Sequence, residues 1–123
     1  MRRRSTISPG GAPGNFLAAL SRYGARTAFL GKVGDDAFGK LLLETMQKAG
    51  IETRGIVVDD SVFTTLAFVT FSPEGDRTFS FARKPGADTR LSFEEIDCSM
   101  LDEASVVHFG TLSLTDDPAR TAT

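Results

Sequence analysis

The segment Ser8–Asn15, Ser-Pro-Gly-Gly-Ala-Pro-Gly-Asn, is the part of the chain best suited to holding a ligand. Its glycines let the backbone come close to a bound molecule, because they carry no side chain and tolerate positive φ angles. The segment leads into a helical pattern, and the first turn of a helix offers unpaired N–H donors at its positive end. The Asn15 carboxamide both donates and accepts hydrogen bonds, which suits a ligand rich in hydroxyl groups.

A simpler interpretation of the same segment is a tight turn in which Asn15 caps the helix that follows. The segment is not a Walker-type phosphate loop, because no Gly-Lys-Ser/Thr ending follows the glycines. The residue types alone leave both the capped turn and the ligand-binding loop open.

The adjacent acids Asp35 and Asp36 are a second candidate for chemistry. Two carboxylates could bind a metal ion, but adjacent acids at a helix start more commonly serve as an N-cap and as partners of the helix dipole. We therefore expect Asp36 to cap the next helix, and we predict no metal site in this chain.

The first half of the chain alternates between helix and strand patterns. Residues 15–23 and 36–49 carry apolar side chains at helical intervals, and a glycine follows each of them. Residues 27–30 form a short apolar run typical of a buried strand, and residues 31–36 are expected to form a turn. This alternation predicts an α/β fold with parallel strands.

The middle of the chain predicts a β-hairpin. Residues 64–71 and 77–81 have strand patterns, and Ser72–Asp76 supplies the proline and glycine of a turn. In the second strand, phenylalanines alternate with threonine and serine, so one face is apolar and the other polar. A further short strand is expected at residues 56–58.

The last third of the chain returns to an α/β pattern. Ser92–Glu95 fits a capping box that opens a short helix, and residues 115–118 begin another helix with an early proline. Residues 105–109 predict a buried strand, in which His108 is expected to be packed rather than to act as a base. Cys98 is the single cysteine, which excludes an internal disulfide, and we expect it to be buried.

The composition excludes several classes of function. The 123 residues are 41% hydrophobic and 24% charged, as in an ordinary globular domain. The net charge of −2 provides no general nucleic-acid surface, although Arg2–Arg4 leave a basic arm for nucleic acid as an alternative. No apolar run reaches the roughly 20 residues of a membrane span. We expect no membrane or nucleic-acid partner, a cytoplasmic location, and a disordered basic terminus at residues 1–9.

Several segments together resemble the N-terminal signature of ribokinase-like (pfkB) carbohydrate kinases. These segments are Gly10–Asn15, Ser21–Gly24, Gly31–Gly39, Thr64–Val69, Arg77–Arg83, Pro85–Asp88 and Val107–Leu114. The Gly-Gly-Ala-Pro form of the first and the Phe-x-Arg ending of the fifth are most similar to fructokinases. The resemblance covers nearly the whole chain after residue 7, and it is more specific for the family than for the sugar.

The resemblance implies Rossmann-type αβα layers with a small β-sheet lid, and an acceptor sugar between body and lid. Residues 10–123 would form an incomplete pfkB domain, with the lid hairpin at about 56–82. The residues that the resemblance places at the sugar are Gly10, Gly11, Asn15, Phe81, Arg83, Gly110 and Thr111. For Arg83, a surface salt bridge is the alternative role. Lids pair in related kinases, which implies a homodimer through the lid.

The chain also departs from the family's pattern. The family begins with a strand that carries a sugar-binding aspartate, whereas only nine residues precede Gly10 and none of them is acidic. The family's catalytic base lies in a Gly-Ala-Gly-Asp motif, and an Asn-x-x-Glu motif serves the metal; neither occurs in this sequence. ATP and Mg²⁺ are thus implied for the full-length family, while no catalytic residue is assigned here.

The sequence therefore predicts a sugar kinase, most like a fructokinase, that phosphorylates a hexose hydroxyl from ATP. This chain would carry only the sugar-binding half and be inactive alone. The alternative is a non-catalytic fragment that binds sugar or dimerises, or the remnant of a broken gene.

Overall fold

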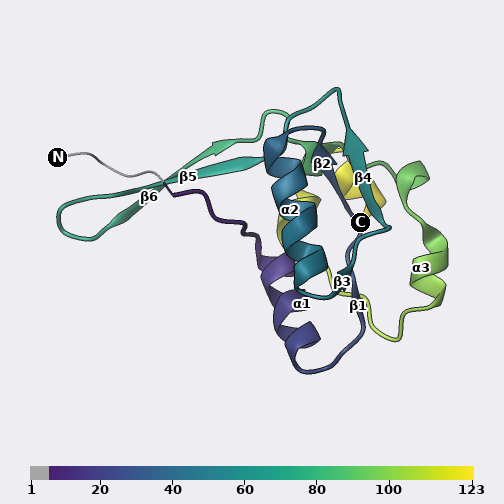
Figure 1. Cartoon of the computed structure of the whole chain (residues 1–123). Helices are drawn as coiled ribbons and strands as arrows, with labels where there is room; N and C mark the ends of the chain where they lie inside the picture. The colour runs from purple at the N-terminus through teal and green to yellow at the C-terminus, as the bar shows by residue number, and fades with distance from the viewer. Residues whose placement is uncertain (1–5) are drawn as a thin grey trace.

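The computed structural model describes residues 6–123, which form a body of helices and short strands with one projecting hairpin (Figure 1). Arg2–Arg4, and with them most of the predicted basic terminus at residues 1–9, lie outside the described residues. The elements in chain order are α1 (Ala12–Arg22), β1 (Thr27–Ala28), β2 (Gly31–Gly34), α2 (Ala37–Lys48), β3 (Ile51–Glu52), β4 (Ile56–Asp59), β5 (Leu66–Phe71), β6 (Arg77–Ala82), the 3-10 turns η1 (Ala87–Arg90) and η2 (Phe93–Glu95), α3 (Cys98–Asp102), η3 (Thr111–Leu114) and α4 (Ala119–Ala122).

Two parallel strand pairs, joined by α2, form the sheet of the body. β1 pairs with β3 and β2 pairs with β4, so α2 is the crossover between neighbouring parallel strands. The Phe29 N–H donates to the Glu52 carbonyl at 3.0 Å, and the Gly31 N–H donates to the Gly55 carbonyl at 3.3 Å. These bonds continue the pairing across the short break between the two pairs. The predicted α/β class with parallel strands is confirmed.

β2 occupies residues that the sequence pattern assigns to a turn. The predicted turn at residues 31–36 is wrong, because Gly31–Gly34 pairs with β4 along its whole length. The two glycines hide the strand pattern, yet the fold requires one of them. A Cβ atom at Gly34 would lie 2.5 Å from the Val62 carbonyl oxygen. The predicted strand at residues 27–30 is shorter than expected and ends at Ala28.

The two long helices lie side by side against the sheet, and both were expected (Figure 1). α1 begins at Ala12 instead of residue 15, because Pro13 fits the first turn, where the N–H that it lacks would have no partner. α2 begins where predicted. The Asp36 carboxylate caps it by accepting hydrogen bonds from the N–H groups of Phe38, at 3.0 Å, and Gly39, at 2.8 Å.

The Asp36 cap also fastens the chain that leads into the hairpin. The Thr64 N–H donates to the second Asp36 carboxylate oxygen at 2.8 Å, and the Gly34 N–H donates to the Thr64 hydroxyl at 2.9 Å. Gly39 packs so closely on the Gly34 carbonyl that a side chain at Gly39 would collide with it. One carboxylate thus joins the end of β2, the start of α2 and the residues before β5.

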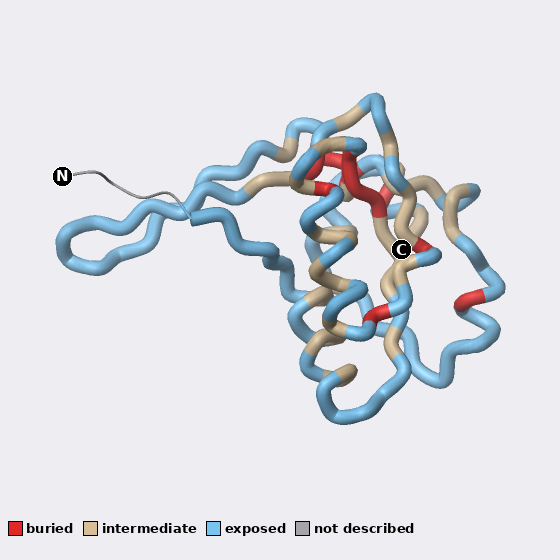
Figure 2. Tube along the Cα trace, viewed as in Figure 1, coloured by how far each residue is buried: buried red, intermediate tan, exposed pale blue. Residues whose placement is uncertain are grey.

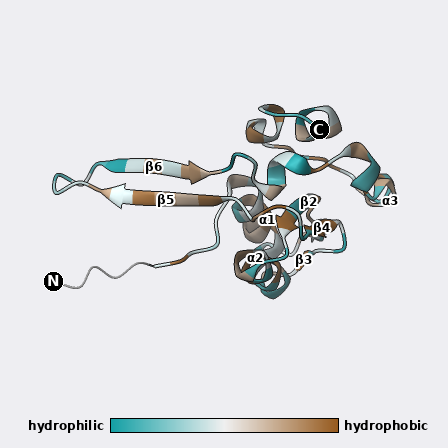
Figure 3. Ribbon diagram, turned by 90° about the horizontal axis from the view of Figure 1, so that it is seen from above, coloured by the Kyte–Doolittle hydropathy of each residue, from teal (hydrophilic) through white to brown (hydrophobic). Residues whose placement is uncertain are grey.

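β5 and β6 form the predicted hairpin, with Leu66 opposite Ala82 and Phe71 opposite Arg77. The hairpin projects from the body and is exposed along most of its length (Figure 2). Seen from above, β5 is largely apolar (Figure 3). The strand at 56–59, which the expected lid range of 56–82 included, is β4 and pairs with β2 in the body.

The register of the hairpin gives it one strongly apolar face. Directly opposed residues share a face, so that Ala67, Val69 and Phe71 lie with Phe81, Phe79 and Arg77. The rings of Phe79 and Phe81 are stacked with centroids 6.2 Å apart, and the Arg77 guanidinium lies 5.7 Å from the centroid of the Phe71 ring. Phe68 and Ser80 lie on the other face.

Three expectations for the last third are wrong. Residues 105–109 form no strand, and Val106 is 83% exposed. A strand requires a hydrogen-bonded neighbour, and within residues 6–123 the strands β1–β4 pair only with each other. His108 is exposed rather than buried, although its ring lies 4.8 Å from that of Phe16, and Cys98 is exposed at the start of α3 rather than buried.

Two smaller features of the same region agree with the sequence. The capping box is present, because the Ser92 N–H donates to the Glu95 carboxylate at 2.9 Å, although it opens the 3-10 turn η2. The predicted last helix is present as α4, but it begins at Ala119, after Pro118, rather than at residues 115–118. Among residues 6–123, no helix is both long and apolar enough to cross a membrane.

The Asp36→Ala substitution is expected to lower the free energy of unfolding by about 2 kcal/mol at pH 7, because the helix loses its cap and the Thr64 N–H its acceptor. The free energy would be measured by urea unfolding. Asp35→Ala is the matched control, because within residues 6–123 the Asp35 side chain makes only an exposed ion pair, with Lys40 at 3.7 Å. Equal losses in the two variants would contradict the assigned role of Asp36.

The same carboxylate predicts a loss of stability in acid. Partial burial works to raise the pKa of Asp36, but hydrogen bonds from Thr64, Gly39 and Phe38 outweigh it and hold the pKa below its usual 3.8. The stability from this group is therefore present above about pH 4 and is lost as the pH falls through the folded-state pKa. The acid loss should be smaller in Asp36→Ala than in the unaltered chain.

Candidate functional site

The start of α1 presents backbone and side-chain groups that the fold itself leaves unused. Gly11 has a φ of +116°, which favours glycine, and a Cβ atom at Gly10 or Gly11 would meet nothing within 4 Å. The two glycines therefore serve the conformation of the chain and leave room for a ligand, rather than allowing close packing inside the protein.

The interpretation of Asn15 as a helix cap is wrong. Gly11 occupies the N-cap position without a side-chain cap bond, and Asn15 lies in the first turn of α1. Its N–H donates to the Gly11 carbonyl at 3.0 Å. Asn15 is exposed, and within residues 6–123 its carboxamide makes no hydrogen bond. A donor and an acceptor are thus available beside the open glycines.

The segment before η3 lies against the same end of α1. A Cβ atom at Gly110 would lie 3.4 Å from Cγ of Pro13, and the rings of His108 and Phe16 are 4.8 Å apart. Gly110 is the N-cap residue of η3, which Thr111 begins. The structure therefore brings Gly110 and Thr111 to the glycine-rich segment, although the two segments are distant in the sequence.

Arg83 joins the base of the hairpin to η3. Its Nε donates to the Asp88 carboxylate at 2.8 Å, Nη1 to the Thr115 hydroxyl at 3.1 Å, and Nη2 to the Leu112 carbonyl at 2.9 Å. The side chain is only 16% exposed. Arg83 does form the salt bridge that was its alternative role, but it also reaches the segment that follows Gly110 and Thr111.

Phe81 remains on the apolar face of the hairpin. It is 61% exposed and stacks on Phe79. It lies two residues before Arg83, at the end of the hairpin that joins the body. The predicted residues thus fall into two groups: the glycine-rich segment with Gly110 and Thr111, and Arg83 with Phe81, linked through η3.

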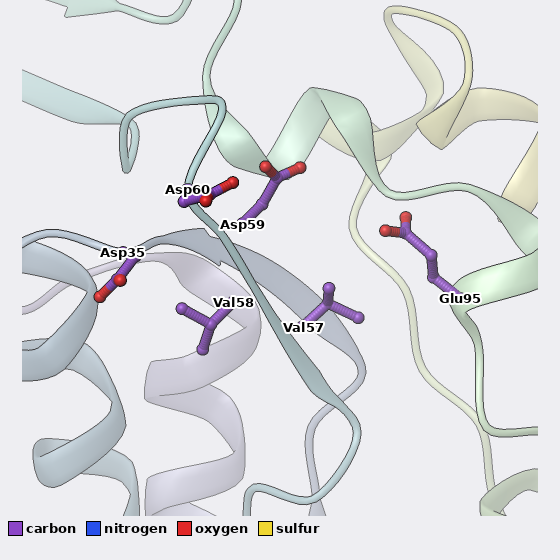
Figure 4. Close-up of a pocket in the computed structure, with 6 residues that line it drawn as sticks. All are labelled: Asp35, Val57, Val58, Asp59, Asp60 and Glu95. Atoms are coloured by element: carbon purple, nitrogen blue, oxygen red, sulfur yellow. The ribbon is translucent and has the colours of Figure 1, made fainter.

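A separate acidic hollow lies at the carboxyl end of β4 (Figure 4). Its lining residues are Asp35, Val57, Val58, Asp59, Asp60 and Glu95. Among residues 6–123, no three or more histidine, cysteine, aspartate or glutamate side chains are grouped to hold a metal ion. Glu95 was expected only to complete the capping box that begins at Ser92.

Two of these carboxylates are already paired with a lysine. The Lys32 ammonium, on a side chain only 4% exposed, lies 3.0 Å from Asp59 and 2.6 Å from Glu95, and donates to the Arg90 carbonyl at 3.2 Å. Burial works to lower the pKa of Lys32, but the hydrogen bonds to Glu95 and Asp59 raise it above 10.5. No local pattern of residues marks this ion cluster, because its members come from β2, β4 and η2.

The bonds at Asp59 explain why the hollow is a poor site for further chemistry. The Ser61 hydroxyl and N–H, and then Lys32, lower the pKa of Asp59 to about 2. Asp59 is therefore ionised and satisfied at neutral pH. Within residues 6–123, the Asn15 carboxamide has no hydrogen-bond partner and lies beside the open Gly10 and Gly11, so the start of α1 is the stronger candidate for a ligand.

Comparisons with known proteins agree on a family. A family model described as "pfkB family carbohydrate kinase" matches residues 3–123. Fructokinase-1 of Zea mays is 44% identical over 115 residues, which make up 94% of this chain and 36% of the maize protein. The chain thus spans about a third of the length of the curated relatives that it matches.

Solved structures give the same result. The crystal structure of a fructokinase from Xylella fastidiosa superposes with a TM-score of 0.87 at 36% identity, over 92% of this chain and 35% of that one. The structure of the Xylella fructokinase with bound ATP superposes with a TM-score of 0.86 at 36% identity, over 92% of this chain and 36% of that one. The fold expected from the sequence, an incomplete ribokinase-like arrangement, is confirmed by these superpositions.

Proposed function

The chain belongs to the pfkB family of carbohydrate kinases, and on this premise we propose that it forms the sugar-binding part of an ATP-dependent fructokinase. The observation that carries the proposal is the free Asn15 carboxamide beside the open Gly10 and Gly11, with Gly110 packed against the same helix end. The fructokinase names of the maize and Xylella relatives support fructose as the sugar.

Each proposed contact has a chemical reason. The Asn15 carboxamide would donate to one sugar hydroxyl and accept from another, and the Gly10 and Gly11 backbone would approach the ring closely. Phe81 would cover an apolar face of the sugar, and Arg83 would donate from N–H groups that its bonds to the protein leave unused. Gly110 and Thr111 would close the site opposite α1.

Phosphoryl transfer itself is not assigned to residues of this chain. The transfer needs a held nucleotide, a metal ion and a base near the attacking hydroxyl. ATP as the donor is supported by the ATP-bound Xylella structure. However, the described residues offer no group of metal ligands, and the sequence has no Gly-Ala-Gly-Asp motif. ATP and Mg²⁺ therefore do not fit a site in this chain, and we derive no step through them.

The hairpin is proposed as the lid and as a contact between two copies of the chain. Residues 10–123 would then be a partial kinase domain whose lid is formed mainly by β5 and β6. A two-stranded hairpin is marginally stable alone, and this one exposes Val69, Phe71 and Phe79 on a single face.

The single free cysteine supports a cytoplasmic location as part of the proposal.

Two assays of the purified chain test whether it binds sugar and whether it transfers phosphate. Calorimetry with fructose is expected to show binding, and ADP release in the presence of ATP and fructose should not exceed background. Turnover above background would contradict the assignment of catalysis to other residues. Absence of binding would contradict the sugar-binding role and favour a gene remnant.

A chimera extends this test to catalysis. In it, the chain replaces the matching 115 residues of maize Fructokinase-1. We expect the chimera to phosphorylate fructose. Asn15→Ala should raise KM for fructose and lower kcat/KM by about 1–3 kcal/mol, because sugar hydroxyls lose their partner. Gln47→Ala, which removes an exposed carboxamide on α2, is the control. Equal kinetics for the two variants would remove Asn15 from the site.

The Phe79→Ser substitution is expected to convert a dimer of the chain into a monomer, because it places a polar group in the middle of the apolar hairpin face. Sedimentation velocity would measure the oligomeric state. Phe68→Ser, on the opposite face of the same hairpin, is the matched control and should leave the dimer intact. A monomeric unaltered chain, or equal effects of both variants, would contradict the lid contact.

A further inference from the structure

Asp88 is bonded to both ends of the hairpin. Its carboxylate accepts a hydrogen bond from the Thr65 hydroxyl, just before β5, and another from Nε of Arg83, just after β6. The Gly86 backbone packs so closely on Thr65 that a side chain at Gly86 would collide with the hydroxyl. Thr65, Asp88 and Arg83 therefore form one compact group at the base of the hairpin.

Arg83 extends this group to η3. A guanidinium is a rigid planar fork with five N–H donors, so fixing Nε fixes the direction in which the other nitrogens point. With Nε held by Asp88, the outer nitrogens meet the Leu112 carbonyl and the Thr115 hydroxyl. Leu112 belongs to η3 and Thr115 caps its end, while Gly110 and Thr111 stand at the start of the same turn.

A competing carboxylate makes the role of Asp88 specific. Asp116 lies 3.9 Å from Nη1 of Arg83, with its side chain 63% exposed. If the Asp88 carboxylate were absent, Asp116 would become the nearest negative partner of the guanidinium, and Arg83 would turn toward solvent. Asp88 accepts the bond from Nε, and this bond directs the outer nitrogens toward η3.

We propose that Asp88 is a positioning residue for the site at α1: it orients Arg83, and Arg83 holds η3 so that Gly110 stays against Pro13. The idea that the positioned groups bind a sugar rests on the proposed function. The link from the hairpin base through Arg83 to η3 is independent of that function. The inference therefore connects the placement of the lid with the geometry of the sugar-binding segment.

The test is hydrogen–deuterium exchange of the purified chain at millisecond resolution, without sugar. In the Asp88→Asn variant, the Ser113 and Thr115 amides, which bond within η3 at 3.3 and 3.4 Å, should exchange about tenfold faster. Exchange in α2 should not change. Asp76→Asn is the matched control, because it removes one negative charge at the hairpin turn, where the side chain makes no hydrogen bond within residues 6–123. Unchanged exchange in η3 would overturn the proposal.

Two further variants separate positioning from general support of the fold. Asp88→Glu keeps the carboxylate and should recover most of the protection of η3. Arg83→Lys keeps the ion pair with Asp88 but cannot reach Leu112 and Thr115 together, so η3 should loosen while the hairpin amides stay protected. If Asp88→Asn speeds amide exchange throughout the chain, the Arg83→Lys variant decides whether the link to η3 is specific. Loosening confined to η3 supports the proposal, and an unchanged η3 contradicts it.

Repeating the exchange with fructose distinguishes this proposal from the proposed function. Protection of residues 10–15 and 110–111 by fructose in the unaltered chain, with at least a tenfold higher fructose requirement in Asp88→Asn, supports both. Loosening of η3 in Asp88→Asn without any response to fructose would retain the positioning link and reject the sugar. A fructose response that Asp88→Asn leaves unaltered would reject the role of Asp88 alone.

Discussion

The buried ammonium of Lys32 is the interaction on which the body of this protein depends. A charge removed from water is costly unless it is paired, and Lys32 meets Asp59, Glu95 and the Arg90 carbonyl at once. These partners belong to β4, η2 and η1, so one cation holds β2 to its neighbouring strand and to the turns beyond the hairpin. With β2 fixed, Gly34 and Asp36 are in place to fasten Thr64, and Thr64 leads into the hairpin. The hairpin is therefore positioned through a chain of polar contacts rather than by a large apolar core.

The same architecture leaves apolar surfaces uncovered. Val106, Val107 and Phe109 are exposed beside α1, and the hairpin exposes one phenylalanine-rich face. Parallel strands are normally covered on both faces, and paired strands normally have neighbours. On the proposed function, the rest of a longer kinase would cover the segment at residues 105–109, and a second copy of the chain would cover the hairpin. The site at α1 would then lie between these surfaces.

The features that sequence reasoning predicted correctly depend on neighbouring residues. The Asp36 cap and the hairpin turn at Ser72–Asp76 are set by local backbone chemistry, and the family was identified from short local motifs. The features that it missed depend on distant partners. Gly31–Gly34 became a strand because β4 pairs with it, and residues 105–109 did not because no described strand pairs with them. Lys32 and Asp88 carry no local signal, since their partners come from other turns and strands. That Asn15 does not cap a helix followed only from where α1 begins, and its role at a sugar stays a prediction.

The proposal that fructose binds at the start of α1 is tested most directly by titrating the isotopically labelled chain with fructose and following the amide chemical shifts. As fructose is added, the chemical shifts of five amides should change together along one saturating curve, because these residues border one site: Gly10, Gly11, Asn15, Gly110 and Thr111. The amides of Asp59 and Asp60, beside the acidic hollow, should stay in place. No shifts at the start of α1, or shifts confined to the acidic hollow, would contradict the assignment of this chain as the sugar-binding part of a fructokinase.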